Sequence, residues 1–312
     1  MKNQLHSIIV PVYQSRDILE VLVDRVSKVM NDAGIAFEMV LVDDGSQDGS
    51  FEKIKQLTEH HKIIRGFGLS RNFGHQAALC IGLSKSRGEF IAIIDDDLQD
   101  PPEILPKFFQ ALYDGVDVVY GVRRLRKESI VKKILYAGFY RLLKILSNID
   151  IPVDAGDFCV MKRCVVDAML QLRESNPFLR GIRSWVGFKQ IGIEYERCAR
   201  HQGESRYTMR KYFSLAITGM LMFSYIPLRI ATYLGIFATA ASSLYTVVII
   251  IYWLIFPFNV PGYLSLVVII AFLGGVQLTS IGIIGEYLAR VNDNVRSWPV
   301  AIIAEATSGE QA

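Results

Sequence analysis

A long stretch without charge near the C-terminus constrains this chain more than any other feature. From Ile230 to Gly285 there is no Asp, Glu, Lys or Arg. A single helix from Ile230 to the residue before Pro257 would be roughly 40 Å long, which exceeds a hydrocarbon core of about 30 Å and allows for tilt. Residues 263–285 are long enough for a second span. The pattern predicts a membrane hairpin of two helices over residues 227–290.

Basic residues stand at the outer ends of this hairpin. Arg229 precedes the first span, Arg290 and Arg296 follow the second, and the connecting loop has no basic residue. Because Lys and Arg are retained on the cytoplasmic side, we expect both ends of the hairpin to lie in the cytoplasm. The spans carry no ionisable residue before Glu286, which argues against an ion-coupled transporter.

The part of the chain before the hairpin alternates apolar strands with helices of the length that crossovers require. Such alternation predicts a parallel, doubly wound α/β sheet. It differs from a dinucleotide-binding Rossmann domain because no Gly-x-Gly-x-x-Gly follows the first strand. We expect a Rossmann-like cytosolic domain over residues 1–226 and a cytosolic tail over residues 291–312. The predicted strands cover residues 6–13, 38–42, 63–69, 89–94 and 117–120.

Two of these predicted strands end in acidic residues. Asp95, Asp96 and Asp97 follow one of them directly, and Asp43 and Asp44 follow another. Ligands of open α/β sheets gather at the carboxyl ends of the strands. Adjacent carboxylates repel one another, and a hard divalent cation neutralises them and can bridge a nucleotide diphosphate. A solvated acidic turn is the alternative for either cluster alone, but the pair favours a site.

Charge and cysteine spacing argue against nucleic-acid binding and against zinc or redox sites. The net charge of +3 is too small to argue for nucleic acid, and no basic patch interleaves with aromatic residues. The four cysteines have neither zinc nor redox spacing and are expected to be buried thiols in a reducing compartment.

Seven strings carry a family resemblance: IIVPVYQS, LVDDGSQDGS, LSRNFGHQAAL, IDDDLQDPPE, VDAGDF, HQGESRY and IGEYLAR. In this order they resemble the family-two, GT-A-fold glycosyltransferases that act on polyprenyl phosphates. This family includes dolichol-phosphate mannose synthase and bacterial undecaprenyl-phosphate glucosyltransferases and aminoarabinosyltransferases. Any one string is weak, whereas seven in order along nearly the whole chain are specific. The predicted two-span tail favours the bacterial glucosyltransferase branch.

The resemblance implies a reaction and a place for it. A sugar, with UDP-glucose as the expected donor, is transferred with inversion to undecaprenyl phosphate. The reaction is expected on the cytoplasmic face of a bacterial inner membrane in which the protein is multi-pass. GDP-mannose and UDP-amino sugars stay open as donors. Relatives with two spans can assemble as tetramers, so a homotetramer is also expected.

The resemblance also assigns the donor site. The family's Asp-x-Asp motif maps to Asp95 and Asp97, which are expected to bind Mg²⁺ or Mn²⁺, with Gln99 as a further ligand. The middle position, usually small in relatives, is Asp96 here, and it joins the nucleotide site with an extra charge. The other residues expected to bind the nucleotide are Pro11, Tyr13, Asp43, Asp44, Ser46 and Arg206.

The acceptor side is assigned in the same way. Arg123 and Arg124 are expected to bind the lipid phosphate, and Arg206 the diphosphate. Without the motifs each of these would be read as a solvated surface arginine. Asp97 and Asp157 are the expected catalytic carboxylates, and Asp154 is the alternative to Asp157, with turn capping as its other role. The chain departs from the family's Phe-Arg-Leu after the acidic residue, because Asp157 is followed by Phe158, Cys159 and Val160.

Histidine is not expected to be catalytic here. A polyprenyl phosphate is already anionic at neutral pH and needs little general-base help, so His75 and His201 are interpreted as capping or hydrogen-bonding residues. The segment Arg180–Phe188 resembles a family stretch beside the acceptor site. The equally good alternative is that its Trp185 and Phe188 pack in the core.

Residues 130–146 and 208–223 have the pattern of amphipathic helices that lie on a membrane surface, with packing on the sheet as the alternative. Two other classes of function stay open. A processive polysaccharide synthase needs a Gln-x-x-Arg-Trp motif, which Arg183-Ser184-Trp185 matches only in part, and more spans. A non-catalytic membrane anchor or flippase component would not need Asp95 and Asp97.

Overall fold

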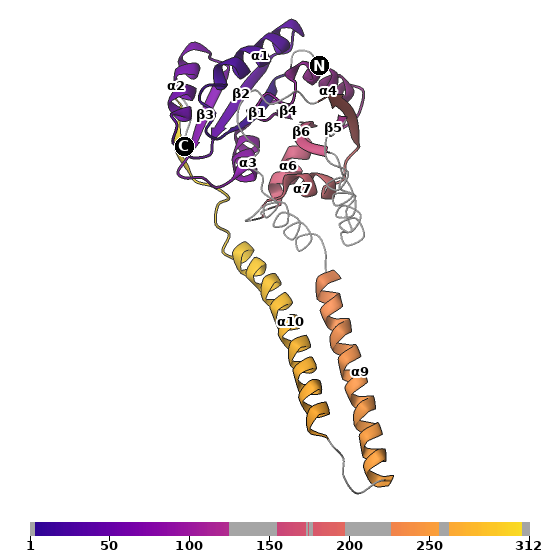
Figure 1. Ribbon diagram of the computed structural model, residues 1–312. Helices are drawn as coiled ribbons and strands as arrows, with labels where there is room; N and C mark the ends of the chain where they lie inside the picture. Colours follow the sequence, from indigo (N-terminus) through magenta and orange to yellow (C-terminus); the bar gives the residue numbers. More distant parts are fainter. Residues whose placement is uncertain are drawn as a thin grey trace. The chain divides into compact units, whose positions relative to one another are not determined.

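A computed structural model of the chain describes residues 4–124, 155–172, 174, 177–196, 226–255 and 262–307 (Figure 1). These residues fall into two units. The first contains the described residues before 197 together with residues 297–307. The second contains the described residues from 226 to 296.

The first unit is built on a single sheet of eight described strands in the order β7-β5-β6-β4-β1-β2-β3-β8. All five strands that the sequence predicts are present within a few residues of the expected bounds. The strands are β1 (His6–Val12), β2 (Phe37–Asp43), β3 (Ile64–Leu69), β4 (Phe90–Ile93), β5 (Val118–Arg124), β6 (Ala155–Lys162), β7 (Gln190–Glu196) and β8 (Ile303–Ala306).

The sheet is mixed, which corrects the expectation of a parallel sheet. The central strands β3, β2, β1 and β4 pair in parallel, but β6 lies between β4 and β5 and is antiparallel to both. At the far edge β8 pairs antiparallel with β3, and the backbone N–H of Thr307 donates to the carbonyl of Gly66 at 3.0 Å. The segment predicted as a cytosolic tail therefore contributes a strand. The boundaries at residues 226/227 and 290/291 stay predictions.

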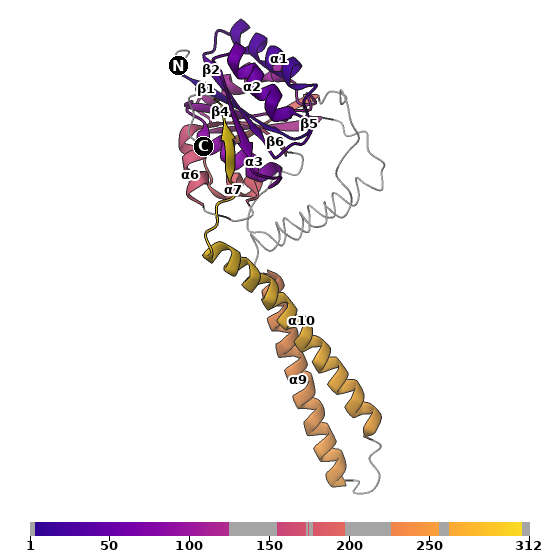
Figure 2. The same ribbon diagram turned by 90° about the vertical axis from the view of Figure 1, so that its left-hand side faces the viewer.

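Helices cover both faces of the sheet (Figures 1 and 2). Helices α1, α2 and α4 enclose the main apolar core on one face, and α3, α6 and α7 cover the other. Helix α3 packs directly on β1 because Gly82 has no side chain, and an added Cβ would collide with Ile9. The described helices of this unit are α1 (Leu19–Asp32), α2 (Ser50–His60), α3 (His75–Lys85), the 3-10 helix η1 (Pro102–Ile104), α4 (Leu105–Tyr113), α6 (Arg163–Gln171) and α7 (Leu179–Trp185).

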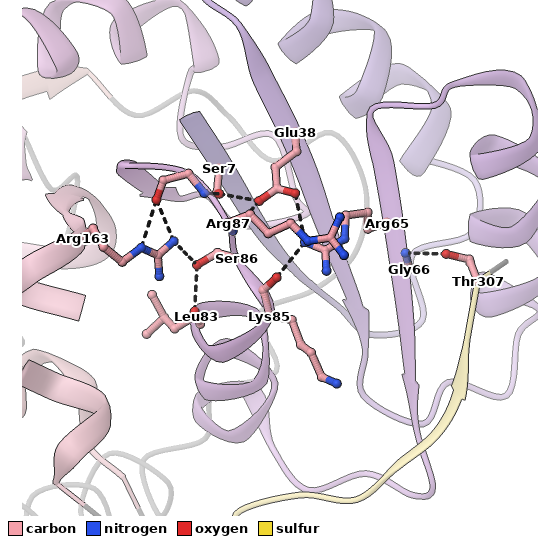
Figure 3. Close-up of polar contacts among 11 residues, drawn as sticks. Ser7, Glu38, Arg65, Gly66, Leu83, Lys85, Ser86, Arg87, Arg163 and Thr307 are labelled. Carbon is pink, nitrogen blue, oxygen red and sulfur yellow. Dashed lines mark hydrogen bonds and ion pairs between the residues drawn. The ribbon is translucent and has the colours of Figure 1, made fainter. Parts of the chain in front are cut away.

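The amino ends of the central strands are joined by a buried polar network (Figure 3). The Glu38 carboxylate accepts hydrogen bonds from Ser7 Oγ at 2.6 Å, Arg65 Nη1 at 2.9 Å and the Arg87 N–H at 2.6 Å. The same Arg65 Nη1 also donates to the carbonyl of Lys85 at 2.7 Å, at the end of α3. Both members of the Glu38–Arg65 ion pair are buried. The network ties three neighbouring strands to a helix and to the start of β4.

The second unit contains two antiparallel helices, α9 (Ile226–Ile255) and α10 (Tyr263–Val295), which lie side by side (Figures 1 and 2). Many of their described apolar side chains are exposed, among them Phe237, Leu254 and Leu278. In the part of the chain that the structure describes, one helical segment, Phe272–Val295, is long and apolar enough to cross a membrane. Helix α9 contains residues 230–255 of the first predicted span and α10 contains the second, and that both cross a membrane stays a prediction.

Several sequence predictions concern residues that the structure does not describe. The amphipathic segments 130–146 and 208–223, together with Asp154, His201 and Arg206, lie outside the described residues. The cysteine prediction is partly wrong, because Cys159 is buried but Cys164 is exposed and Cys80 is half-buried.

Candidate active site

The expected site residues meet at the carboxyl edge of the sheet. Strands β2, β1 and β4 are neighbours, and the last residue of β1, Val12, lies in register with Asp43 at the end of β2. The N–H of Ile94, just before the acidic cluster, donates to the carbonyl of Ile9 in β1. Strand β6 runs the opposite way and begins at this edge, so Asp157 also stands near it. The two acidic strand ends are therefore brought together as the sequence predicts, and the roles of the residues stay predictions.

Asp96 holds the loop that follows β1. Its Oδ2 accepts hydrogen bonds from Ser15 Oγ at 2.5 Å and from the N–H of Tyr13 at 3.2 Å. Ser46 Oγ accepts from the N–H of Gln14 at 2.8 Å in the same loop, where Gln14 has a φ of 51°. The extra acidic residue of the Asp95–Asp97 run therefore fastens two loops together. That contact explains how a charged residue is accommodated at a position that is usually small.

Asp43 and Asp44 are both buried, but they are used differently. The Asp44 carboxylate accepts the N–H groups of Phe73 at 2.7 Å and Gly74 at 2.9 Å, so it holds the loop that leads into α3. Asp43 Oδ2 accepts the N–H of Ser46 at 3.1 Å, whereas its buried Oδ1 has no hydrogen-bond partner among the described residues. Burial raises the pKa of both carboxyl groups. Asp43 is therefore the one with an oxygen left for a ligand.

His75 lies between the Asp95 and Asp157 carboxylates. As the first residue of α3, it places Nε2 3.7 Å from Asp95 Oδ1 and 3.4 Å from Asp157 Oδ2. Asp95 Oδ1 is buried and accepts no hydrogen bond from the described residues. The sequence interpretation of His75 as a capping or hydrogen-bonding residue stays a prediction, and its position between two carboxylates of the acidic cluster was missed. The available signal was that His75 starts a helix directly after β3, at the same edge of the sheet.

Three side chains hold Asp157. Arg180 Nε donates to Asp157 Oδ1 at 2.8 Å, and Gln76 Nε2 donates to Asp157 Oδ2 at 3.1 Å, beside the contact from His75. Gln76 also accepts the N–H of Leu179 through Oε1 at 2.9 Å, so one amide joins α3, β6 and α7. Arg180 and Gln76 were not expected in these roles, because their meeting depends on helix packing rather than on sequence spacing.

The charges of the cluster set its protonation. Burial alone would raise the pKa of Asp157, but Arg180 and His75 outweigh it and hold the pKa well below its usual range. Burial would lower the pKa of His75, but the hydrogen bond to Asp157 and the charge of Asp95 raise it to about 9. Burial raises the pKa of Asp95 to about 7, because repulsion from Asp100 adds to it and the charge of His75 opposes it only in part. Asp157 is therefore a fixed anion, whereas His75 compensates the charge of Asp95 only in part.

The acidic residues fit a divalent cation only in part. No group of three or more His, Cys, Asp or Glu in the described residues is arranged to hold a metal ion. The unsatisfied Oδ1 of Asp95 and the nearby carboxylate of Asp97 are hard oxygen donors of the kind that Mg²⁺ and Mn²⁺ favour. Asp97 Oδ1 accepts the N–H of Gln99 at 3.1 Å across a turn in which Leu98 has a φ of 55°. The donor set fits a cation that takes further ligands from a diphosphate and water.

For the predicted acceptor residues Arg123 and Arg124, the structure describes the backbone. Arg123 and Arg124 end β5, where their backbones pair with Tyr195 and Glu196 of β7. Trp185 and Phe188 are exposed, at 58% and 45%, so the alternative in which they pack in the core is wrong.

The chain matches known proteins over most of its length. Residues 7–170, more than half of the chain, match the Glycosyl transferase family 2 profile. The uncharacterized glycosyltransferase YkcC of Bacillus subtilis (strain 168) is 39% identical over 302 residues, which cover 96% of this chain and 94% of that protein. The SfII prophage-derived bactoprenol glucosyl transferase of Shigella flexneri is 36% identical over 304 residues, which cover 97% of this chain and 98% of the relative.

Among solved structures, a complex of glucosyl-3-phosphoglycerate synthase from Mycobacterium tuberculosis with Mn²⁺, UDP and phosphoglyceric acid has a TM-score of 0.48 at 16% identity. The aligned region covers 70% of this chain and 77% of the synthase chain. The family match and the near full-length relatives confirm the resemblance seen in the motifs, and the mixed α/β sheet agrees with the GT-A-like fold that the resemblance implies. This chain is a glycosyltransferase and belongs to glycosyl transferase family 2.

Proposed function

We propose that this glycosyltransferase moves glucose from UDP-glucose to a polyprenyl phosphate, undecaprenyl phosphate in bacteria, at the cytoplasmic face of the membrane. The observation that carries the proposal is the meeting of Asp43, Asp95 and Asp157 at one sheet edge, where the first two keep a buried oxygen without a hydrogen-bond partner among the described residues. Near full-length relatives named bactoprenol glucosyl transferase support the choice of sugar and acceptor.

The donor side uses the unsatisfied oxygens. Asp43 accepts hydrogen bonds from the nucleoside, which Pro11, Tyr13 and Ser46 enclose. Asp95 and Asp97, with Gln99, would hold Mg²⁺ or Mn²⁺. Such an ion neutralises the diphosphate and makes it a better leaving group. Arg206 adds a cation to the same group, and Asp44 and Asp96 keep the surrounding loops in place.

On the acceptor side, Asp157 acts as a fixed negative charge. The phosphate oxygen of the lipid attacks C1 of the sugar while the bond from C1 to the diphosphate oxygen breaks, so the configuration at C1 inverts. No proton needs to leave the acceptor, because its phosphate is already anionic. Asp157, held ionised by Arg180, faces the positive charge that develops on the sugar ring in the transition state. Arg123 and Arg124 hold the acceptor phosphate.

The membrane arrangement belongs to the same proposal. Two spans over residues 227–290 would anchor a cytoplasmic catalytic domain in a multi-pass protein. The charge-free sequence from Ile230 to Gly285 and the exposed apolar side chains of α9 and α10 support it, since exposed apolar surface of this extent is unfavourable in water. The segments 130–146 and 208–223 would lie on the membrane surface.

The reaction is tested with the purified protein, radiolabelled UDP-glucose and undecaprenyl phosphate. A lipid-soluble labelled product that forms only with the acceptor supports the proposal. A water-insoluble polymer would instead indicate a processive synthase, and no incorporation would indicate a non-catalytic component. Repeating the assay with other UDP- and GDP-sugars identifies the donor, and chelation with EDTA, followed by addition of Mg²⁺ or Mn²⁺, tests the need for a cation.

Topology is tested separately, by single cysteines in an otherwise cysteine-free protein in intact cells. A cysteine at Asn259, between the two spans, should react with an impermeant thiol reagent. A cysteine at Gln47, beside the nucleotide site, should react only after the membrane is opened. Labelling of the Gln47 position in intact cells would place the site where no nucleotide sugar is supplied and would overturn the proposal.

A further inference from the structure

An apolar pocket of about 320 Å³ lies within the first unit, on the face of the sheet that α3, α6 and α7 cover. Residues of α3, α6 and α7 form three walls of this pocket, and the segment Ser297–Val300 forms the fourth. The described lining residues include no Lys, Arg or His, and Glu174 is the one charged residue among them. The main apolar contributors are Leu83, Met169, Leu170, Leu179, Ile182 and Trp298.

One contact joins this pocket to the proposed active site. Leu179 lines the pocket, and its N–H donates to Gln76 Oε1 at 2.9 Å. The other end of the Gln76 side chain donates to Asp157, and Arg180, the next residue of α7, also donates to Asp157. The pocket and the Asp157 carboxylate therefore lie on two sides of the same contact between α3 and α7. Gln76 therefore connects a residue that lines the pocket with Asp157, a carboxylate of the proposed active site.

The fourth wall of the pocket is continuous with a candidate membrane span. Ser297 to Val300 are among the first residues after α10, which ends at Val295. Trp298 is 68% exposed and Ile302 54%, although both are large and apolar. Tryptophan is enriched where membrane and water meet, because its ring is apolar and its N–H is polar. If α10 spans the membrane as proposed, this wall belongs at the lipid surface.

We propose that the pocket receives the isoprenoid chain of the acceptor lipid, at the units next to the phosphate. The proposal rests on the proposed function. The lining disfavours the charged parts of the substrates, because a diphosphate or a lipid phosphate requires cations, and the described lining residues include no Lys, Arg or His. A branched hydrocarbon needs only apolar walls, and the volume is at the lower end of the range for small-molecule sites. The phosphate then stays outside the pocket, on the Asp157 side.

A matched pair of substitutions on α6 tests this assignment. Leu170 lines the pocket and is half-buried, whereas the next residue, Gln171, is exposed and does not line it. Leu170→Asp should raise the KM for undecaprenyl phosphate about tenfold, because it places a charge against the chain. The KM for UDP-glucose should not change. Gln171→Asp adds the same charge to the same helix and should leave both constants unchanged. Equal constants in the two variants would overturn the proposal.

Photo-crosslinking to the wild-type protein gives a second measurement that does not depend on a variant folding. The probe is a polyprenyl phosphate with a diazirine in its first isoprene units, added to the full-length protein in phosphatidylglycerol vesicles. Labelled peptides should contain Leu170 or Trp298, and excess undecaprenyl phosphate should suppress the labelling. Labelling confined to other peptides would overturn the proposal, as would equal suppression by extra phosphatidylglycerol, which would identify the occupant as bulk lipid. Wild-type protein that labels in the pocket but transfers no sugar would refute the proposed function alone.

Discussion

The first unit has acidic side chains at both ends of its central strands, the amino edge and the carboxyl edge of the sheet, and their hydrogen bonding differs between the two. At the amino edge, Glu38 accepts three hydrogen bonds and pairs with Arg65. At the carboxyl edge, Asp43 and Asp95 each keep a buried oxygen without a hydrogen-bond partner among the described residues. An unsatisfied buried polar atom costs free energy, and the proposed function explains these two as contacts for a ligand. Both edges carry buried acidic groups, so what distinguishes the edge of the proposed site is that two of its carboxylates are not fully hydrogen-bonded by the described residues.

Asp157 stands between these two cases. It lies at the carboxyl edge, yet Arg180, Gln76 and His75 surround it as completely as Glu38 is surrounded at the other edge. Its partners belong to α3 and α7 rather than to neighbouring strands. Complete pairing keeps Asp157 charged, which suits a residue that stabilises positive charge and does not suit one that must take up a proton. Under the proposed function, Asp95 and Asp157 therefore take different roles, although both are acidic and both lie beside His75.

The largest expected effect comes from neutralising an unsatisfied oxygen. Asp95→Asn should lower sugar transfer by at least about 100-fold, because it removes a ligand charge from the diphosphate site. The same change should leave the thermal midpoint at pH 8 unchanged or raise it, since the pKa of Asp95 is raised to about 7 and its ionised form is therefore unfavourable in the fold. Turnover and calorimetry on the same preparation measure both. Asp24→Asn, an exposed carboxylate on α1, is the control and should alter neither.

The opposite result is expected at the amino edge. Glu38→Gln leaves the buried Arg65 without its counter-ion, which costs about 3–5 kcal/mol of unfolding free energy. Transfer per folded molecule should stay at the wild-type level because no contact at the site changes. Denaturant unfolding combined with activity per folded molecule measures the two quantities. Glu20→Gln breaks the exposed pair with Lys53 and should have little effect on stability. Loss of specific activity in Glu38→Gln would mean that the two edges are not independent.

A smaller effect is expected from removing a partner of Asp157. Arg180→Ala should lower turnover about tenfold, because a charge-assisted hydrogen bond is lost. In the wild type the pKa of Asp157 lies well below its usual range, so acidification toward pH 5 should not protonate it. Without Arg180, burial should raise that pKa, and activity should fall as the pH decreases. Arg180→Lys should restore part of the turnover. Arg163→Ala, which removes hydrogen bonds to Gly88 and Ser86 at the amino edge, should keep the wild-type pH profile.

The carboxyl edge could be predicted from sequence because two of its strands, β2 and β4, are apolar runs that end in acidic residues. Ile91 to Ile94 followed by Asp95 gives both the strand and its end. Strand β6 was not predicted. Its antiparallel direction is set by pairing with β4, and the alternation of apolar and polar residues along a strand does not indicate direction. Strand β8 has only four residues and pairs with a strand far earlier in the chain. The position of His75 at the start of the helix after β3 indicates the edge on which it lies, but its contact with Asp157, like that of Arg180, depends on tertiary packing.

The smallest expected effect is a change at the amino edge in how the unfolding free energy depends on pH. His6 is buried in β1, where Nδ1 lies 3.1 Å from the Ala36 carbonyl and Nε2 2.6 Å from the Tyr113 hydroxyl. Burial lowers the pKa of His6, so the unfolded chain takes up a proton near pH 6.5 that the folded protein does not bind. The contribution of His6 is therefore fully present above that pH and decreases as the pH falls toward the folded pKa, by at most about 1.4 kcal/mol per pH unit. His6→Asn should flatten the dependence of unfolding free energy on pH between 7 and 5. An unchanged slope would mean that His6 binds its proton in the folded protein as it does in the unfolded chain.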